Sequence, residues 1–194
     1  MQQYLNRLIS WIKKNRLYLN KAKCFIVSYS KKEHILNFNY CIEGGSLSRL
    51  EIFKDLGVTF DRNFLFTNHI SECISQAYKM YGFIFRNCRE FSNVHALLTL
   101  FNSLVRSRLE YCALIWHPIY AIHIQQLEKV QRKFLKFVSY LIDGTYPPQG
   151  CDHRTLLRRF NCCSLSTRRT IIIIKFLYNL VNYNSKCAYL VGKI

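Results

Sequence analysis

Residues 127–141 read LEKVQRKFLKFVSYL, and their apolar positions recur with helical spacing. At about 100° per residue, the apolar side chains fall on one side of a helix and the cations fall opposite them. The apolar set is Leu127, Val130, Phe134, Phe137 and Leu141, and the basic set is Lys129, Arg132, Lys133 and Lys136. The stretch therefore predicts an amphipathic helix with a buried apolar face and a basic outer face.

Helical spacing continues on both sides of this stretch. Before it, one helix is expected to bury positions from Ile70 to Ile84, and a second is expected from about Asn93 toward Trp116, where Pro118 stops it. After it, an irregular connection through 143–150 leads to a helical hairpin, in which we expect the apolar run 171–174 to be buried.

The first part of the chain has a different pattern. A short amphipathic helix is expected first, and β-branched and aromatic residues then predict strands that are joined by the polar stretch 31–33 and by a turn at Gly44-Gly45. The helix is expected over 4–15 and the strands over 24–29, 38–42, 46–50 and 53–60. The sequence thus predicts an α+β chain, with a small antiparallel β unit over 1–64 and an all-helical region over 65–194.

Composition limits the classes of partner and compartment. The chain has 28 Lys and Arg against 11 Asp and Glu, and a net charge of +17 favours phosphate-rich or membrane-surface partners without choosing between them. The start lacks the apolar core of a secretory signal, so an intracellular location, nucleus or cytoplasm, is expected. The run 171–174 is far too short to span a membrane, so no membrane partner is expected.

The nine cysteines suit free thiols better than a disulfide framework, because their number is odd and their spacings do not repeat. Four ligand-type residues lie close together in the sequence, but their spacing does not follow the pairing of structural zinc sites. These residues are Cys151, His153, Cys162 and Cys163. No metal site is expected there.

A series of short motifs resembles the reverse transcriptases of non-LTR retrotransposons, of the insect jockey-like type. Residues 11–24, WIKKNRLYLNKAKC, are similar to motif D, the segment after the catalytic aspartate pair. Further matches follow in the same order and cover nearly the whole chain. They are KDLGVTFD at 54–61, F-x-x-H-I at 66–70, Ala77, LEYC at 109–112, IW at 115–116, LEKVQRKFL at 127–135, L-x-x-R-R at 165–169 and FLY at 176–178.

The resemblance implies both a fold and a family activity. Residues 1–64 would be a palm remnant with a primer-grip-like hairpin, and residues 65–194 would be a thumb-like helical region. The family is an RNA-directed DNA polymerase that uses Mg²⁺, and its partners are an RNA/DNA hybrid or RNA; the oligomeric state stays open.

The family's polymerase centre is not expected in this chain. Nucleotidyl transfer needs carboxylates that hold two metal ions, and in this family three aspartates supply them, two of which are adjacent. The aspartates here are Asp55, Asp61, Asp143 and Asp152, none adjacent to another. The family's acidic box would lie before residue 1, so we expect no polymerase activity and no cofactor in this chain.

The resemblance also supplies candidate site residues. Lys23 matches the motif D lysine, which is proposed to assist the departing pyrophosphate, and Leu56-Gly57 matches the primer-grip turn. The alternatives are a surface lysine and an ordinary hairpin turn.

Basic residues of the helical region could follow phosphates, and the alternative is that they form solvated faces. They are Lys129, Arg132, Lys133, Lys136, Arg158, Arg159, Arg168 and Arg169. Aromatic residues near Arg86 could stack on bases, although their helical spacing also suits core packing. They are Tyr78, Tyr81, Phe83 and Phe85.

Three hypotheses about the chain follow. It is a truncated reverse transcriptase-like protein of retrotransposon origin, or a non-catalytic nucleic-acid-binding module that has kept the basic helical surface. The third is a chain that does not fold alone, because strands at 25–27 and 56–58 would expose apolar surface once covered by a larger sheet.

Overall fold

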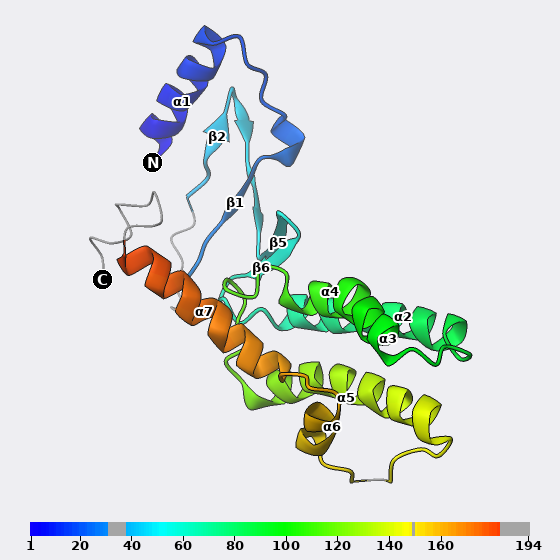
Figure 1. Ribbon diagram of the computed structural model, residues 1–194. Coiled ribbons are helices and arrows are strands. Elements are labelled where there is room, and N and C mark those ends of the chain that lie inside the picture. Colours follow the sequence, from blue (N-terminus) through cyan, green and yellow to red (C-terminus); the bar gives the residue numbers. More distant parts are fainter. Residues whose placement is uncertain (31–37, 149, 183–194) are drawn as a thin grey trace. The chain divides into compact units, whose positions relative to one another are not determined.

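The computed structural model describes residues 1–30, 38–148 and 150–182. The chain divides into two compact units, Met1–Phe66 and Thr67–Ile194, where the sequence predicts a division between 64 and 65. The described strands lie in the first unit and the longest helices lie in the second (Figure 1). The predicted α+β class, a small β unit followed by a helical bundle, is therefore confirmed. The expected connection at 31–33 lies outside the described residues.

The described part of the first unit contains short strands that pair two by two. They are β1 (Phe25–Val27), β2 (Cys41–Ile42), β3 (Gly45–Ser46), β4 (Ser48–Leu50), β5 (Ile52–Asp55) and β6 (Val58–Asp61). β2 pairs with β3 and β5 with β6 in antiparallel fashion, as expected. β1 pairs with β4 in parallel, with Phe25 opposite Ser48, so the expectation of a wholly antiparallel unit is wrong for this pair.

Two tight turns set the strand order of this unit. The prediction of one strand over 53–60 is wrong, because Leu56 (φ 45°) and Gly57 (φ 84°) reverse the chain between β5 and β6. The other hairpin turns at Glu43 (φ 48°) and Gly44 (φ 79°), one residue earlier than predicted. Two successive positive φ values are typical of the type I′ turn, whose twist matches that of the flanking strands.

Aromatic rings form the core around the β5–β6 hairpin. The Phe53 ring stacks on Phe60 with centroids 5.2 Å apart and lies 5.5 Å from Phe25, while Phe60 meets Phe66 edge-on at 5.7 Å. Val58 on β6 is 1 % exposed. The expectation that 56–58 exposes apolar surface is therefore wrong for Val58, although Leu56 at the turn is 83 % exposed.

Polar contacts attach the first helix, α1 (Gln2–Lys14), to the β2–β3 hairpin. The Gln2 side chain donates to the Cys41 carbonyl at 2.8 Å and accepts from the Cys41 amide at 3.0 Å. Glu43 pairs with Lys13 at 2.9 Å and with Lys21, in the 3₁₀ turn η1 (Lys21–Lys23), at 2.7 Å. The apolar positions Leu5, Ile9 and Ile12 of α1 are half-buried, and none of its side chains is fully buried.

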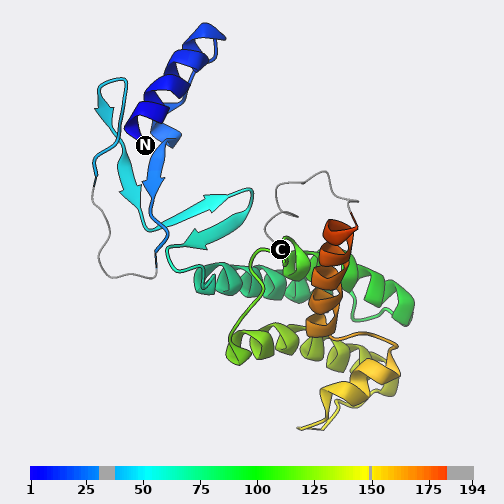
Figure 2. The same cartoon turned by 90° about the vertical axis from the view of Figure 1, so that its left-hand side faces the viewer.

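The regular structure described in the second unit is all helical. Its elements are α2 (Thr67–Asn87), α3 (Val94–Leu100), the π-helical η2 (Phe101–Arg106), α4 (Ser107–Glu110), α5 (Ala121–Asp143), α6 (His153–Arg159) and α7 (Leu165–Val181). α2 contacts η2, α4 and α5, and α5 contacts α6 and α7. Figures 1 and 2 both show α2 and α5 side by side.

The core of this unit lies on the predicted apolar faces of α2 and α5. Ile70, Ile84, Leu127 and Phe134 are all fully buried, and the Phe134 ring stacks on Phe101 with centroids 4.3 Å apart. Stacked rings of this kind add to the free energy gained by burying their area. Packing between α2, η2 and α5 therefore stabilises the surface on which the basic residues of α5 are carried.

The helix predicted from Asn93 is confirmed at its start, where the Asn93 side chain caps α3 by accepting from the Ala96 amide at 3.1 Å. It continues through η2 and ends with α4 at Glu110, before the predicted limit. Trp116 lies in the following loop, where it is buried and donates its indole N–H to the Tyr111 carbonyl at 2.7 Å.

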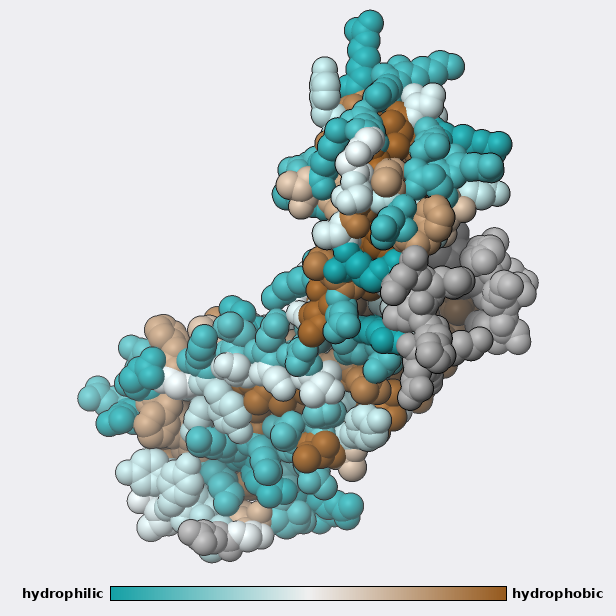
Figure 3. Space-filling model, turned by 180° about the vertical axis from the view of Figure 1, so that it is seen from behind, coloured by the Kyte–Doolittle hydropathy of each residue, from teal (hydrophilic) through white to brown (hydrophobic). Residues whose placement is uncertain are grey.

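The run of isoleucines in α7 is helical but not buried as predicted. Ile171 is 53 % exposed and Ile174 is 60 % exposed, because packing of α7 buries Leu165, Arg169 and Leu180 instead. Figure 3 shows hydrophobic side chains reaching the molecular surface at several places on the face drawn there. Over the ranges described, no helix has both the length and the apolar character needed to cross a membrane.

Candidate nucleic-acid interface

The basic face of α5 is formed as its sequence predicts. Lys129, Arg132 and Lys133 are exposed, and Lys136 is half-buried and donates to the Pro148 carbonyl at 3.4 Å. The four positions fall on one stripe because they are spaced by three or four residues. Across 67–148 and 150–182, no carboxylate forms an ion pair with any of them. We call these four residues the α5 stripe.

Lys133 also borders an aromatic pocket between α2 and the end of α5. Its ammonium lies 5.4 Å from the ring centre of Tyr78 and 5.8 Å from that of Tyr81. The pocket has a volume of about 550 Å³ and is lined further by Phe85 and Tyr146. Of the predicted stacking residues, Phe83 is exposed and does not line it.

The arginine pair of α6 is split between two roles. Arg158 is exposed, whereas Arg159 binds Asp143 at the end of α5 through two hydrogen bonds, at 2.6 and 2.7 Å. The hydrogen bond from Arg159 holds the pKa of the Asp143 carboxyl below its usual value. Arg159 therefore joins α6 to α5, and Arg158 is the member of the pair that remains available to a ligand.

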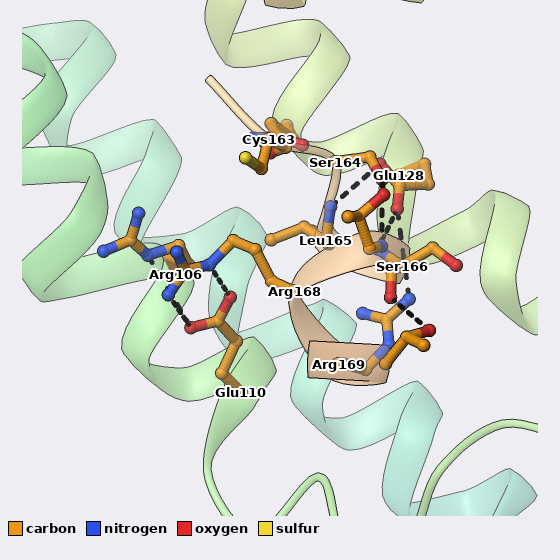
Figure 4. Close-up of polar contacts among 12 residues, drawn as sticks. Arg106, Glu110, Glu128, Cys163, Ser164, Leu165, Ser166, Arg168 and Arg169 are labelled. Carbon is orange, nitrogen blue, oxygen red and sulfur yellow. Dashed lines mark hydrogen bonds and ion pairs between the residues drawn. The ribbon is translucent and has the colours of Figure 1, made fainter. Parts of the chain in front are cut away.

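The arginine pair of α7 is occupied by carboxylates of the same unit (Figure 4). Arg168 binds Glu110 of α4 through Nε at 2.5 Å and Nη2 at 3.0 Å, and Arg106 approaches the same carboxylate at 3.7 Å. This geometry is that of a two-pronged arginine–carboxylate pair, which fixes both partners. Arg168 thus holds α7 against α4.

The prediction that Arg169 contacts phosphate is wrong, because its side chain is 0 % exposed. Its Nη2 lies 4.0 Å from Glu128 Oε1, and within the described residues its nitrogens make no hydrogen bond. A buried guanidinium depends on a nearby opposite charge, since burial without one is costly. The spacing of two adjacent arginines could not show that one of them faces the core.

Glu128 is the residue that the predicted site omitted. Its carboxylate accepts from the amides of Leu165 at 3.4 Å and Ser166 at 2.6 Å, in the first turn of α7, and contacts His153 Nε2 at 3.2 Å. An anion at this position interacts favourably with the helix dipole and with unpaired amides. The sequence offered one signal for these glutamates, because the matched motifs LEYC and LEKVQRKFL each place a glutamate directly after a leucine. The two glutamates, Glu110 and Glu128, are the partners of Arg168 and Arg169 respectively.

The network around Glu128 predicts acid sensitivity. Burial raises the pKa of Glu128, but the hydrogen bonds from His153 and Ser166 and the charge of Arg169 outweigh it, so the pKa is lowered from 4.5. A carboxyl group with a lowered pKa contributes stability above its unfolded value, and this contribution is lost as the pH falls through the folded value. We expect the free energy of unfolding of the second unit to fall as the pH drops below 4.5.

Urea unfolding followed by circular dichroism at stepwise lower pH measures this loss. The Glu128→Gln variant should show a weaker dependence on pH in the same range, since its side chain cannot be protonated. An identical pH dependence in the two proteins would contradict the assignment to Glu128.

Candidate residues of the first unit form a separate group. Leu56 and Gly57 occupy the exposed turn of the β5–β6 hairpin, and Lys23 is exposed at the end of η1. These positions are compatible with contact to a ligand, and equally with the ordinary hairpin turn and surface lysine considered above. The described residues contain no group of three or more His, Cys, Asp or Glu placed to hold a metal ion.

Comparison with known proteins gave no match to a protein-family model, to a curated protein or to a solved structure.

Proposed function

We propose that this chain is a reverse transcriptase-like protein of retrotransposon origin whose second unit binds RNA or an RNA/DNA hybrid through the α5 stripe. The motif series supports the origin, and the thumb-like assignment of the helical unit rests on the same resemblance. The binding role rests on the structure of α5 itself.

The observation that carries the proposal is that, among the described residues of the second unit, no carboxylate forms an ion pair with the α5 stripe. Arg159, Arg168 and Arg169 have carboxylates beside them, whereas within the described part of the unit the stripe has none. Cations without carboxylate partners are free to displace the counterions of a phosphate backbone, which is the main source of sequence-independent affinity. Arg158 on α6 adds a further exposed cation.

The proposal includes no nucleotide transfer by this chain. Two-metal catalysis needs clustered carboxylates, and the four aspartates of the sequence are separated from one another. Incubation of the chain with a primer–template, Mg²⁺ and nucleotides should therefore give no extension. Extension above that of a blank would overturn this part of the proposal.

Removal of stripe cations is expected to reduce the salt dependence of binding. In the Lys129→Gln/Arg132→Gln variant, the slope of log K against log salt concentration for single-stranded RNA should fall by about 0.7 for each cation that contacts a phosphate. Fluorescence anisotropy with labelled RNA and with an RNA/DNA hybrid, at several salt concentrations, measures the slope.

The matched control is Lys79→Gln/Lys175→Gln, which removes the same charge from exposed positions on α2 and α7. It should leave the slope nearly unchanged. Equal slopes for the two double variants would show that net charge, and not the α5 stripe, determines binding, and would contradict the proposed interface.

A further inference from the structure

The pocket beside Lys133 differs from a packed helix contact in shape and chemistry. It has a volume of about 550 Å³ and is lined by aromatic rings and two cations of the second unit. The lining residues are Tyr78, Tyr81, Gly82, Phe85, Arg86, Lys133 and Tyr146. Sites for small aromatic groups have volumes in this range and combine apolar walls with a few polar groups.

A glycine inside α2 helps to keep the pocket open. Gly82 lies in the middle of a helix, where glycine costs about 1 kcal/mol relative to alanine. A Cβ atom added there would approach Arg86 Nη1 at 3.3 Å. Apart from proline, glycine is the residue that least favours a helix, and α2 carries it at the position where a side chain would enter the pocket.

The charges around the pocket are of one sign. Lys133 lies over the rings of Tyr78 and Tyr81, Arg86 lines the wall, and the Arg89 guanidinium lies 5.1 Å from the Phe85 ring centre. No carboxylate is among the described residues that line the pocket. Burial raises the pKa of the Tyr81 hydroxyl, so this group stays protonated and can donate a hydrogen bond.

The geometry points to a pocket that receives an unpaired base of a single-stranded nucleic acid, stacked on Tyr146 or Phe85, while the α5 stripe binds the adjoining phosphates. This inference rests on the proposed function and adds the ligand class that the aromatic pocket recognises. Lys133 belongs to both features, because it is a member of the stripe and lines the pocket. Every base has a flat π face, so aromatic side chains can bind single strands of different sequence.

The test compares two labelled oligomers of equal length and charge, oligothymidylate and its abasic analogue. Binding of the full chain to each is measured by anisotropy at one salt concentration. We expect oligothymidylate to bind more tightly, and we expect Tyr146→Leu to weaken its binding by about tenfold while leaving the abasic oligomer unaffected. Phe83→Leu, at a half-exposed position of α2 outside the pocket, is the matched control and should change neither.

A second variant tests the pocket without removing an aromatic residue. Gly82→Leu should fill the space and improve the helix propensity of α2, so the folded protein should lose its preference for oligothymidylate without losing thermal stability. Equal binding of both oligomers by the unaltered chain would overturn the base pocket and leave the phosphate interface standing. Absence of binding to either oligomer would overturn this inference, and absence of binding to RNA and to the RNA/DNA hybrid as well would overturn the proposed function.

Discussion

Replacement of Glu128 with glutamine is expected to lower the free energy of unfolding of the helical unit by about 3 kcal/mol. Glutamine retains the size of the side chain and can still accept from the α7 amides, but it removes the negative charge beside Arg169. Because Arg169 is fully buried, its guanidinium would then lack the opposite charge that offsets its desolvation. The attraction between an anion and the first turn of α7 would also be lost.

Urea unfolding of this variant can be followed through Trp116, which is fully buried in the helical unit. In a Trp11→Phe background it is the chain's remaining tryptophan, since the sequence contains two. Glu90→Gln makes the same chemical change at an exposed position and should alter stability by less than about 0.5 kcal/mol. A Glu128→Gln protein as stable as this control would refute the role given to the carboxylate.

The second large effect is expected from Phe134→Ala, which should destabilise the helical unit by about 3–5 kcal/mol. Phe134 is fully buried on α5 and stacks on Phe101, so alanine would leave a cavity between α5 and η2. Thermal unfolding followed by circular dichroism, together with urea unfolding, measures the loss.

The matched control lies on the same helix. Tyr140 is 43 % exposed, and Tyr140→Ala removes an aromatic ring without opening a cavity in the core. Its effect should be clearly smaller than that of Phe134→Ala. Equal losses would indicate that the helix depends on aromatic content at its surface as much as on the packed core.

The sequence predicts the long helices well because their apolar positions repeat over several turns. The predicted apolar positions are buried except for Ile74 and Leu141, which are half-buried. The buried ones are Ile70, Ala77, Tyr81 and Ile84 on α2 and Leu127, Val130, Phe134 and Phe137 on α5. The prediction that the isoleucines of α7 are buried is wrong because four consecutive apolar residues point in every direction around a helix. Periodicity cannot show which side of such a run will be covered.

The β unit was harder to predict because its strands are short. Leu56-Gly57 lacks the Asn-Gly or Asp-Gly pair that most strongly signals a type I′ turn, and the apolar residues on either side suggested one continuous strand. The parallel pairing of β1 with β4 joins residues more than twenty positions apart, such as Phe25 and Ser48. Local patterns carry no information about such pairing.

The candidate site was predictable where it depends on one helix and unpredictable where it depends on several. The α5 stripe follows from spacing alone. Whether Arg168 and Arg169 are available to phosphate depends on Glu110 and Glu128, which belong to other helices and approach the arginines only after folding. A count of exposed cations therefore overstated the phosphate-binding surface on α7.

The pairing of Arg168 with Glu110 also has a consequence for the order of events during synthesis. The two residues are 58 positions apart, and Arg169 follows immediately as the partner of Glu128. α5 belongs to the segment between them, so both carboxylates, Glu110 and Glu128, are synthesised before their arginine partners on α7. The helical unit can thus complete its assembly only after α7 has left the exit tunnel, and a nascent chain arrested before Arg168 should remain sensitive to protease.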